Sequence, residues 1–419
     1  MRYEQVFVPG GFPVHTYNPR TALNLEQRLA ESKHNLCKLV TVTGQTKSGK
    51  TVLARRVFPQ EQAVWVDGGA ASTESSVWEA VVAKLDLFQS KEEQTSKGSS
   101  ATIHATGKAA ANFLVAKGSG EVGGAVGSTR ESVSRRTQSL PSALIAQQGL
   151  RALNVPLVID DFHYLPKDTQ GTLIRALKPL VFDGLPVAII AIPHRRYDSV
   201  KVEKEMTGRI AQIEIPTWSE DELRFIPEIG FKLLASHLSD DVTARLSHEA
   251  IGSPHLMQDF CRSLCKLYFT AANDRLPPLI EPSPHQLEAV FKEVAETIGR
   301  PIFEKLARGP RQRSDRLPRE LKNGRTVDIY ELVLHALAQI RPGLVSLEYE
   351  DLRSAIKEIS ASHIPQLQEV ARVLKHMATI ASSDQSSTPV IDFEEEEKRL
   401  HITDPFFAFY LRWGELAAA

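Results

Sequence analysis

Eight consecutive residues carry the clearest chemical signal in this sequence. They are Gly44-Gln45-Thr46-Lys47-Ser48-Gly49-Lys50-Thr51, which match the pattern G-x-x-x-x-G-K-[ST] in full, with Val52 directly after them. Glycines at this spacing let backbone N–H groups turn toward phosphate oxygens, and a helix that begins here adds its dipole. We expect Lys50 to reach the β- and γ-phosphates of a nucleotide, and Thr51 to hold Mg²⁺ through its hydroxyl.

A pair of carboxylates provides the second half of the predicted site. Asp160 and Asp161 follow the apolar run 155–159. A carboxylate at the carboxyl end of such a strand lies beside the Mg²⁺ position, so Asp160 is predicted to be the metal-side ligand. Asp161 would then orient or deprotonate the attacking water. The alternative is an ordinary pair of aspartates at the end of a strand.

Two further polar positions lie next to apolar runs. His194, in the segment Pro193-His194-Arg195-Arg196, follows the fourth run, and we expect it to contact the γ-phosphate. Arg195 and Arg196 are rivals for that role, and a solvated turn is the alternative for all three. Arg209 precedes the last run and is a candidate arginine finger for a neighbouring subunit. A surface salt bridge is the alternative for Arg209.

Short apolar runs must position these side chains. Each is typical of a buried strand, and helical patterns separate most of them. The sequence therefore predicts an α/β fold with a parallel sheet covered on both faces, in which strand, phosphate loop and helix follow in the required order. The runs are 39–43, 63–67, 155–159, 187–192 and 211–215.

The remainder of the chain has other patterns. Residues 216–275 read as helices only, and a Gly/Ser-rich stretch at about 95–135 reads as a mobile insertion or, alternatively, a β-hairpin for self-association. Helices, a loop at Ser382–Thr388 and a strand-like end are expected near the C-terminus. The expected parts are a lead-in over 1–33, a core over 34–216, a helical lid over 217–275, a basic linker over 276–325 and a C-terminal domain over 326–419.

Composition excludes several classes of protein. Hydrophobic residues make up 42% and charged residues 24%, which excludes a mostly disordered chain. The net charge of −1 gives no global basic field for nucleic acid, and no apolar run is long enough for a membrane span. Three cysteines exclude a disulfide scaffold and fit a cytoplasmic location. Cys261 and Cys265 lack the partners of a zinc site and are expected to be buried.

Taken together, these motifs resemble the AAA+ and STAND classes of P-loop ATPases over roughly residues 35–270. Gly208-Arg209-Ile210 and the residues up to Leu223 resemble the AAA+ junction between core and lid, and Gly252-Ser253-Pro254 resembles the GxP motif of the STAND lid. The resemblance implies ATP and Mg²⁺ as ligands, Pro254 near the nucleotide base, and the lead-in 1–33 near the adenine.

The resemblance also implies a function. An Asp-Asp pair is more typical of STAND proteins than the Asp-Glu of AAA+ motors, which favours slow ATP hydrolysis by a switch. Such a switch would couple nucleotide state to homo-oligomerisation or to activation of an effector or sensor protein, as in prokaryotic antiphage defence. The rival is a DNA-associated AAA+ ATPase of the transposition or remodelling type. A scaffold that merely retains the loop is a weaker third.

Residues 326–419 resemble the winged-helix domain that ends many prokaryotic STAND-type ATPases, including a tail of the form Asp404-Pro405-Phe406-Phe407. Winged helices often read DNA with their third helix. Here that helix offers only Arg372 and Lys375, and the acidic run 394–397 would repel phosphate. The stretch 300–325 holds nine basic residues against three acidic ones, so it predicts either DNA contact or a solvated linker.

Overall fold

The computed structural model describes residues 1–34, 37–90, 102–105, 141–192, 208–269, 275–310, 316–343, 346–361, 363–382, 390–395 and 397–415. The chain forms two compact units. We call Thr21–Gly44 with Lys50–Ile215 the sheet unit, and Met1–Arg20 with Gln45–Gly49 and Pro216–Ala419 the helical unit. The phosphate loop is therefore divided: its tip, Gln45–Gly49, belongs to the helical unit, and its two ends belong to the sheet unit.

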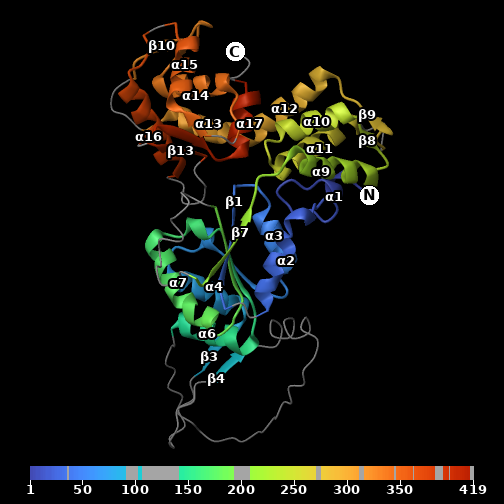
Figure 1. Cartoon of the computed structure of the whole chain (residues 1–419), viewed down its shortest axis with the longest axis vertical. Coiled ribbons are helices and arrows are strands. Elements are labelled where there is room, and N and C mark those ends of the chain that lie inside the picture. The colour runs from blue at the N-terminus through green and yellow to red at the C-terminus, as the bar shows by residue number, and fades with distance from the viewer. Residues whose placement is uncertain are drawn as a thin grey trace, which may run out of the picture. The chain divides into compact units, whose positions relative to one another are not determined.

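A five-stranded sheet organises the sheet unit (Figure 1). Its order is β2-β5-β6-β1-β7, and every neighbouring pair is parallel. The five apolar runs of the sequence are these five strands, so the predicted α/β fold with a parallel P-loop NTPase-type core is confirmed. The strands are β1 Leu39–Gly44, β2 Val64–Asp67, β5 Leu157–Asp160, β6 Val187–Ala191 and β7 Ile210–Ile215.

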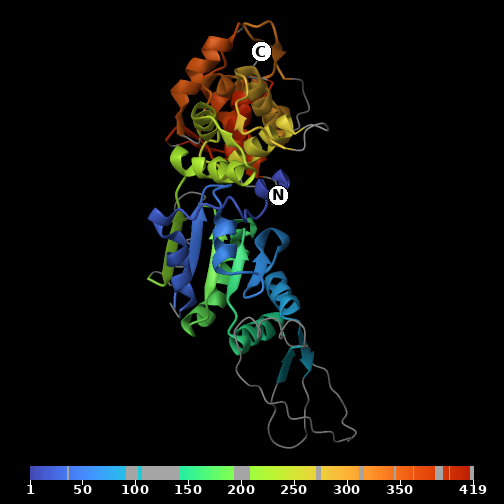
Figure 2. The same cartoon turned by 90° about the vertical axis from the view of Figure 1, so that its right-hand side faces the viewer.

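Each face of this sheet has its own hydrophobic core, because alternate residues of a strand point to opposite faces. In β5, Leu157 and Ile159 join the cluster beneath α4, α6 and α7, whereas Val158 joins the cluster beneath α2 and α3. Helices on both faces are visible in Figure 2. These helices are α2 Leu25–Ala30, α3 Lys50–Val57, α4 Glu74–Lys84, α6 Ser142–Leu153 and α7 Lys167–Phe182.

The stretch between β2 and β5 contains a short antiparallel ladder. Strands β3 (Leu87–Ser90) and β4 (Thr102–Ala105) pair with each other outside the main sheet. Most of the predicted insertion at about 95–135 lies outside the described residues, so its role stays a prediction. Single 3₁₀ turns also occur in this unit, at Thr21–Leu23, Glu31–Lys33, Gly68–Ala70 and Phe162–Tyr164.

The first part of the helical unit consists of the short helix α1 near the N-terminus and a group of helices that follows β7. Ser219 caps α9 in a reciprocal capping box with Glu222, and Ser239 and Ser253 cap the next two helices. The expectation of helices only is wrong in one detail, since β8 (His237–Leu238) pairs with β9 (Leu279–Ile280). The helices are α1 Tyr3–Val6, α9 Glu220–Leu233, α10 Asp240–Glu249, α11 Pro254–Tyr268, α12 Pro284–Ile298 and α13 Arg300–Arg308.

The C-terminal part of the helical unit combines four helices with a three-stranded sheet and the two-stranded ladder of β10 and β11. The antiparallel order β12-β14-β13 and the preceding helices are compatible with the expected winged-helix domain. The strand-like end is only partly confirmed, because β14 is followed by a helix that Asp404 and Pro405 begin. The elements are β10 Arg319–Glu320, β11 Thr326–Val327, α14 Ile329–Ile340, β12 Ser346–Glu348, α15 Tyr349–Ile359, α16 Leu367–Ser382, β13 Ile391–Glu394, β14 Arg399–Ile402 and α17 Pro405–Trp413.

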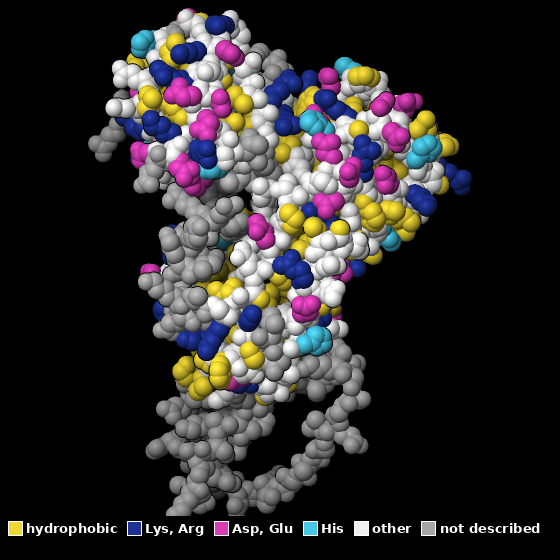
Figure 3. All heavy atoms as spheres, viewed as in Figure 1, with side chains coloured by type: hydrophobic (Ala, Val, Ile, Leu, Met, Phe, Trp, Pro, Cys, Tyr) yellow, Lys and Arg dark blue, Asp and Glu magenta, His cyan; other side chains and the backbone are white. Residues whose placement is uncertain are grey.

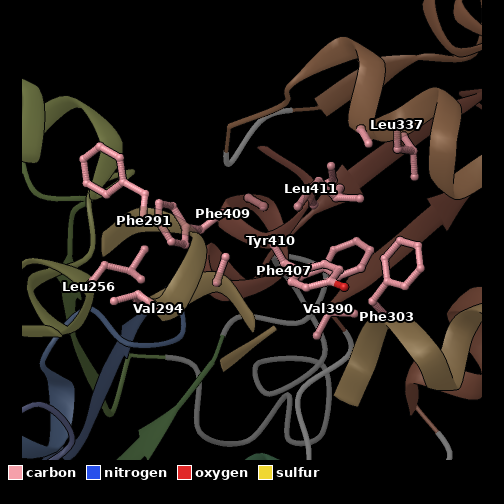
Figure 4. Packing of buried hydrophobic residues seen from close by; sticks show 14 of the residues in the cluster. Leu256, Phe291, Val294, Phe303, Leu337, Val390, Phe407, Phe409, Tyr410 and Leu411 are labelled. Atoms are coloured by element: carbon pink, nitrogen blue, oxygen red, sulfur yellow. The ribbon is translucent and has the colours of Figure 1, made fainter. Parts of the chain in front are cut away.

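Helix α17 joins the two parts of the helical unit through one continuous core. Figure 4 shows Phe407, Phe409 and Tyr410 of α17 among side chains from both parts. The Phe409 ring lies 5.1 Å from that of Phe260 and 6.0 Å from that of Phe291, measured between centroids. These residues are almost fully buried, so separating the parts would expose a large apolar surface.

Candidate nucleotide-binding site

The ends of the phosphate loop meet a carboxylate within the sheet unit. Strand β1 ends at Gly44 and helix α3 begins at Lys50, so the loop leads from the carboxyl edge of the sheet into a helix N-terminus. Lys50 is buried, and its Nζ donates a hydrogen bond to the Gly44 carbonyl over 2.9 Å. Thr51 Oγ1 donates to Asp160 Oδ1 over 3.2 Å.

The Asp160 carboxylate is placed where a cation would stabilise it. Its Oδ1 also accepts a hydrogen bond from the Asp161 backbone N–H over 3.0 Å. Burial raises the pKa of Asp160, while the hydrogen bonds and the charges of Arg55 and Lys50 act in the opposite direction. A bound divalent cation would stabilise the charged form of such a desolvated carboxylate.

The residues present fit a bound Mg²⁺. One carboxylate and one hydroxyl within hydrogen-bond distance are typical of a site at which Mg²⁺ keeps several waters and takes the rest of its oxygens from phosphate. Among the described residues no group of three or more His, Cys, Asp or Glu side chains could hold a metal ion by itself. The donor set therefore favours Mg²⁺ bound together with a nucleotide rather than a metal held by protein alone.

Asp161 occupies a conformation that constrains its surroundings. Its φ is +52°, in the left-handed region, and it precedes the 3₁₀ turn Phe162–Tyr164. A Cβ added at Gly68 would lie 2.6 Å from the Asp161 carbonyl oxygen, so only glycine fits there. The backbone of β2's carboxyl end thus packs closely against the segment that carries both aspartates.

The tip of the phosphate loop is held by the segment that leads into α9. Trp218 Nε1 donates a hydrogen bond to the Ser48 carbonyl over 2.9 Å, and Thr217 Oγ1 donates to Gln45 Oε1 over 3.1 Å. Gly252 lies against Thr217, and a Cβ there would come within 2.2 Å of Thr217 Cγ2. Gly252, the first residue of Gly252-Ser253-Pro254, therefore allows its backbone to pack closely against Thr217. Its φ of +68° also favours glycine.

Arg20 fixes this leading segment. Its guanidinium donates to the carbonyls of Pro216 and Thr217, makes two bonds to the Glu222 carboxylate, and lies over the Trp218 ring at 4.8 Å from the centroid. The Arg20 side chain is buried, and it holds the pKa of Glu222 below its usual range although desolvation acts against this. Arg20 and Trp218 thus form the support beneath Ser48.

Lys47 extends from the tip toward α17. Its Nζ lies over the Phe406 ring, 5.3 Å from the centroid. Burial raises the pKa of Asp404, and the Lys47 charge offsets part of that rise. The His255 ring meets Phe406 edge-on at 4.8 Å between centroids. Pro254, the residue predicted to lie near the base, is the first residue of α11 and directly precedes His255. Helix α17 thus contacts the loop tip through Phe406, and the lid helix α11 contacts the same ring through His255.

The remaining predicted residues have different outcomes. Thr46, Gly49 and Val52 lie in the loop or at the start of α3, as the motif requires, and Gly49 has a φ of +93°. His194 lies outside the described residues. Arg209 lies at the amino end of β7, while Gly44 pairs with Ile215 at the other end. Six strand rises, about 20 Å, therefore separate Arg209 from Ile215, the residue opposite the first glycine of the phosphate loop.

Several residues of this site were not predicted. Arg20, Trp218, Phe406 and Asp404 lie far from the loop in sequence and belong to no nucleotide-binding pattern. One signal was available: an Asp followed by Pro predicts a helix N-terminus, which is where Asp404 accepts hydrogen bonds from the Phe406 and Phe407 N–H groups. The contact of that helix with Lys47 could not be read from spacing.

The sheet order, the loop geometry and the Thr51–Asp160 contact define the class of fold as that of a P-loop NTPase. Comparison with solved structures agrees: the Walker-type ATPase PABY2304 of Pyrococcus abyssi superposes with a TM-score of 0.55 at 13% identity, covering 96% of this chain and 99% of that one.

Two other solved structures match the chain with lower TM-scores. Cdc6p of Pyrobaculum aerophilum has 15% identity and a TM-score of 0.46, and the match covers 99% of this chain and 98% of that one. The Orc1 protein of Aeropyrum pernix in complex with DNA has 15% identity and a TM-score of 0.45, and the match covers 98% of this chain and 96% of that one. The sequence matches no protein-family model and no curated protein. In the part of the chain that the structure describes, we find no helix with both the length and the apolar character needed to cross a membrane.

Proposed function

We propose that this chain is an ATP-binding switch of the AAA+ or STAND type that binds Mg²⁺ with the nucleotide and hydrolyses ATP slowly. The contact between Thr51 Oγ1 and Asp160 Oδ1 carries the proposal, because it joins the first helical turn after the phosphate loop to a strand-end carboxylate. No other chemistry is suggested by the described residues around that contact.

Each residue of the site has a defined task in this proposal. Lys50 would exchange its bond to the Gly44 carbonyl for one to the β- and γ-phosphates, and the backbone of the loop would enclose them. Thr51 and Asp160 would hold Mg²⁺, which neutralises charge on the phosphates when bound. Asp161 would orient the attacking water. Pro254 would approach the base, as expected from the resemblance.

Hydrolysis is proposed to need a second subunit. Arg209 is exposed and its guanidinium lies over the Phe182 ring at 5.6 Å, far along β7 from its own phosphate loop. Arg209 is therefore too far from the phosphate loop of its own chain to act there. Its exposed position instead suits an arginine finger that reaches the nucleotide site of a neighbouring subunit. His194 remains the proposed contact to the γ-phosphate. A homo-oligomer follows from this arrangement.

The helical unit is proposed to transmit nucleotide state. The loop tip packs on Trp218, and the lid and C-terminal parts share one core through α17. We therefore favour movement of the helical unit as a body, leading to oligomerisation or to activation of an effector or sensor protein. Release of the C-terminal part alone is disfavoured because it would split that core. A role in antiphage defence follows only from the family resemblance.

The division of the chain that we propose with this function has five parts. They are a lead-in over 1–33, a core over 34–216, a lid over 217–275, a linker over 276–325 and a winged-helix domain over 326–419.

DNA binding is the rival function, and intramolecular contacts of the arginines in the basic stretch 300–325 argue against it. Arg300 bonds Glu304 over 2.8 Å, Arg316 bonds Asp328, and Arg319 donates to the His363 carbonyl over 2.9 Å. Arg311 and Arg313 lie outside the described residues.

The third helix of the proposed winged-helix domain, α16, also has few basic side chains that are available to bind DNA. Arg372 and Lys375 of α16, together with Lys398, border a pocket of about 300 Å³, but Lys375 pairs with Glu395 over 2.5 Å. On the face seen in Figure 3, acidic and basic side chains are interspersed over the helical unit. A protein partner therefore fits this part better than a phosphate backbone does.

The proposed function is tested by nucleotide binding and turnover. Lys50→Ala should abolish ATP binding, and Asp160→Asn should leave binding but lower Mg²⁺-dependent hydrolysis at least tenfold. Lys84→Ala, an exposed lysine at the end of α4, is the matched control and should behave as the wild type. Unchanged ATP affinity in Lys50→Ala would contradict the site. Stimulation of turnover by DNA, lost at high salt, would favour the rival.

A further inference from the structure

Lys47 is the charged residue at the tip of the phosphate loop, and α17 receives its side chain. The ammonium lies over the Phe406 ring at 5.3 Å from the centroid. Asp404, two residues earlier, caps α17 by accepting hydrogen bonds from the Phe406 and Phe407 N–H groups over 2.8 and 3.0 Å. The first turn of α17 therefore presents an aromatic face and a carboxylate to one cation, which is a favourable arrangement for it.

His255 completes the surroundings of this contact without adding positive charge. Burial and the nearby Lys47 charge lower the pKa of His255 to about 4, so the imidazole is neutral at pH 7. Its Nε2 lies 3.5 Å from Asp259 Oδ2. The Lys47 ammonium thus lies over the Phe406 ring, and its charge acts on the nearby Asp404 carboxylate and on the neutral His255 imidazole.

The first turn of α17 cannot move with Lys47 when the phosphate loop changes conformation, because the other end of the helix is held by contacts with the lid. Trp413 Nε1 donates a hydrogen bond to the buried Glu249 carboxylate over 2.8 Å, and Arg412 lies 3.5 Å from the same carboxylate. The Phe291 ring lies 4.9 Å from the Trp413 ring, centroid to centroid. The position offered to Lys47 is therefore fixed by the core of the helical unit.

We propose that Phe406, supported by Asp404, is an autoinhibitory partner of Lys47 that phosphate must displace when a nucleotide enters the loop. This inference rests on the proposed function, because it assigns the C-terminal helix to the regulation of the same nucleotide site. The loop tip that faces the β- and γ-phosphates in this motif carries Lys47, and one ammonium cannot lie over Phe406 and on a phosphate oxygen together.

Two consequences follow from linkage. Binding of phosphate to the loop frees the first turn of α17 from Lys47, and any event that draws α17 away raises nucleotide affinity by the same factor. A partner protein that engages the C-terminal part would then act on the nucleotide site through one contact. Phe406 is a positioning residue here, since it acts through Lys47 and does not touch the nucleotide.

The test compares ATP affinities of the full-length chain in the presence of Mg²⁺. Phe406→Leu removes the aromatic face and keeps an apolar side chain, so the dissociation constant for ATP should fall about two- to fivefold, as expected for loss of a cation–π contact. Phe406→Tyr keeps the ring and should match the wild type. Phe269→Leu, at the opposite end of α11 from His255, is the control and should also match it.

A double-mutant comparison separates this role from a structural one. In a Lys47→Met background, Phe406→Leu should change ATP affinity by less than 1.5-fold, a margin of about the measurement error. An equal gain with and without Lys47 would overturn the inference, and so would weaker or unchanged ATP binding by Phe406→Leu. If the wild type does not bind ATP, or if Lys50→Ala still binds ATP, the proposed function would instead be overturned.

Discussion

Trp413 Nε1 of α17 donates a hydrogen bond to the buried Glu249 Oε2 of α10 over 2.8 Å. Arg245 lies 3.1 Å from the other oxygen of the same carboxylate. One acid of the lid is thus shared between its own helix and the C-terminal helix. This contact explains why the lid and the C-terminal part form one unit instead of two separable domains.

Removing the shared acid should weaken that unit. Glu249→Gln keeps an acceptor for Trp413 but loses the charge that faces Arg245 and Arg412, so we expect the free energy of unfolding to fall by about 1–3 kcal/mol. Denaturant unfolding followed by tryptophan fluorescence measures this change. Glu74→Gln, which keeps a bond to Trp78 in the sheet unit, is the control. Equal stability of Glu249→Gln and wild type would contradict the shared-carboxylate account.

The aromatic core between the two parts should be more costly to disturb. Phe409→Ala removes a fully buried ring that lies near the rings of Phe260 and Phe291, so a loss of about 3–5 kcal/mol is expected. Calorimetry should also show whether the unit still melts in one transition. A loss below about 1 kcal/mol, or two separate transitions of the helical unit already in the wild type, would show that the core is not continuous.

Gly252 is predicted to be essential because of Thr217. Gly252→Ala would place a Cβ 2.2 Å from Thr217 Cγ2 at a φ of +68°, so we expect a cost of about 2–4 kcal/mol and weaker ATP binding. Thr217→Ser removes Cγ2 and keeps the hydroxyl that bonds Gln45, so the double variant should recover part of the loss. Only the left-handed strain, about 1–2 kcal/mol, should then remain. An absence of rescue would contradict the steric explanation.

The stability of the helical unit should depend on pH below neutrality. Burial, with the charge of Arg325, lowers the pKa of His335 to about 4, from 6.5 in the unfolded chain. Between these values the unfolded state binds more protons, so stability falls as pH falls from about 6.5 to about 4, by up to about 3 kcal/mol. His255 has the same pKa and adds its own share.

Urea unfolding across pH 4 to 7 measures this dependence. His335→Leu replaces the buried imidazole by an apolar side chain, and its stability curve should be flatter than that of the wild type. The remaining slope is set by His255 and by Asp259, whose pKa burial raises to about 6 and which therefore acts in the opposite direction. An equal slope in both proteins would contradict the assignment to His335.

Much of the sheet unit follows from local sequence. The parallel strands were predictable because both faces of the sheet are buried, which forces continuous apolar runs such as 187–192. Lys50, Thr51 and Asp160 were predictable because a strand and a loop of fixed spacing position them. Cys261 and Cys265 are buried on α11, as expected from the absence of zinc partners.

The contacts of the loop tip were not predictable in the same way. Trp218 contacts Ser48 across 170 positions of sequence, and Arg20 in turn lies over the Trp218 ring. No spacing rule describes such tertiary contacts. The helix α17 was missed because its apolar residues 405–411 face a core on most sides and so lack an amphipathic period. Pairing of β8 with β9 depends on two residues each, too few for a sequence pattern.

The mass of the particle in solution, measured with ADP and with a non-hydrolysable ATP analogue for the wild type and Lys50→Ala, tests the central claim most directly. A nucleotide-controlled switch predicts a larger assembly only with the ATP analogue and only when Lys50 is present, and loss of hydrolysis but not of assembly in Arg209→Ala. The same mass in all four samples would contradict an ATP-driven assembly of this chain.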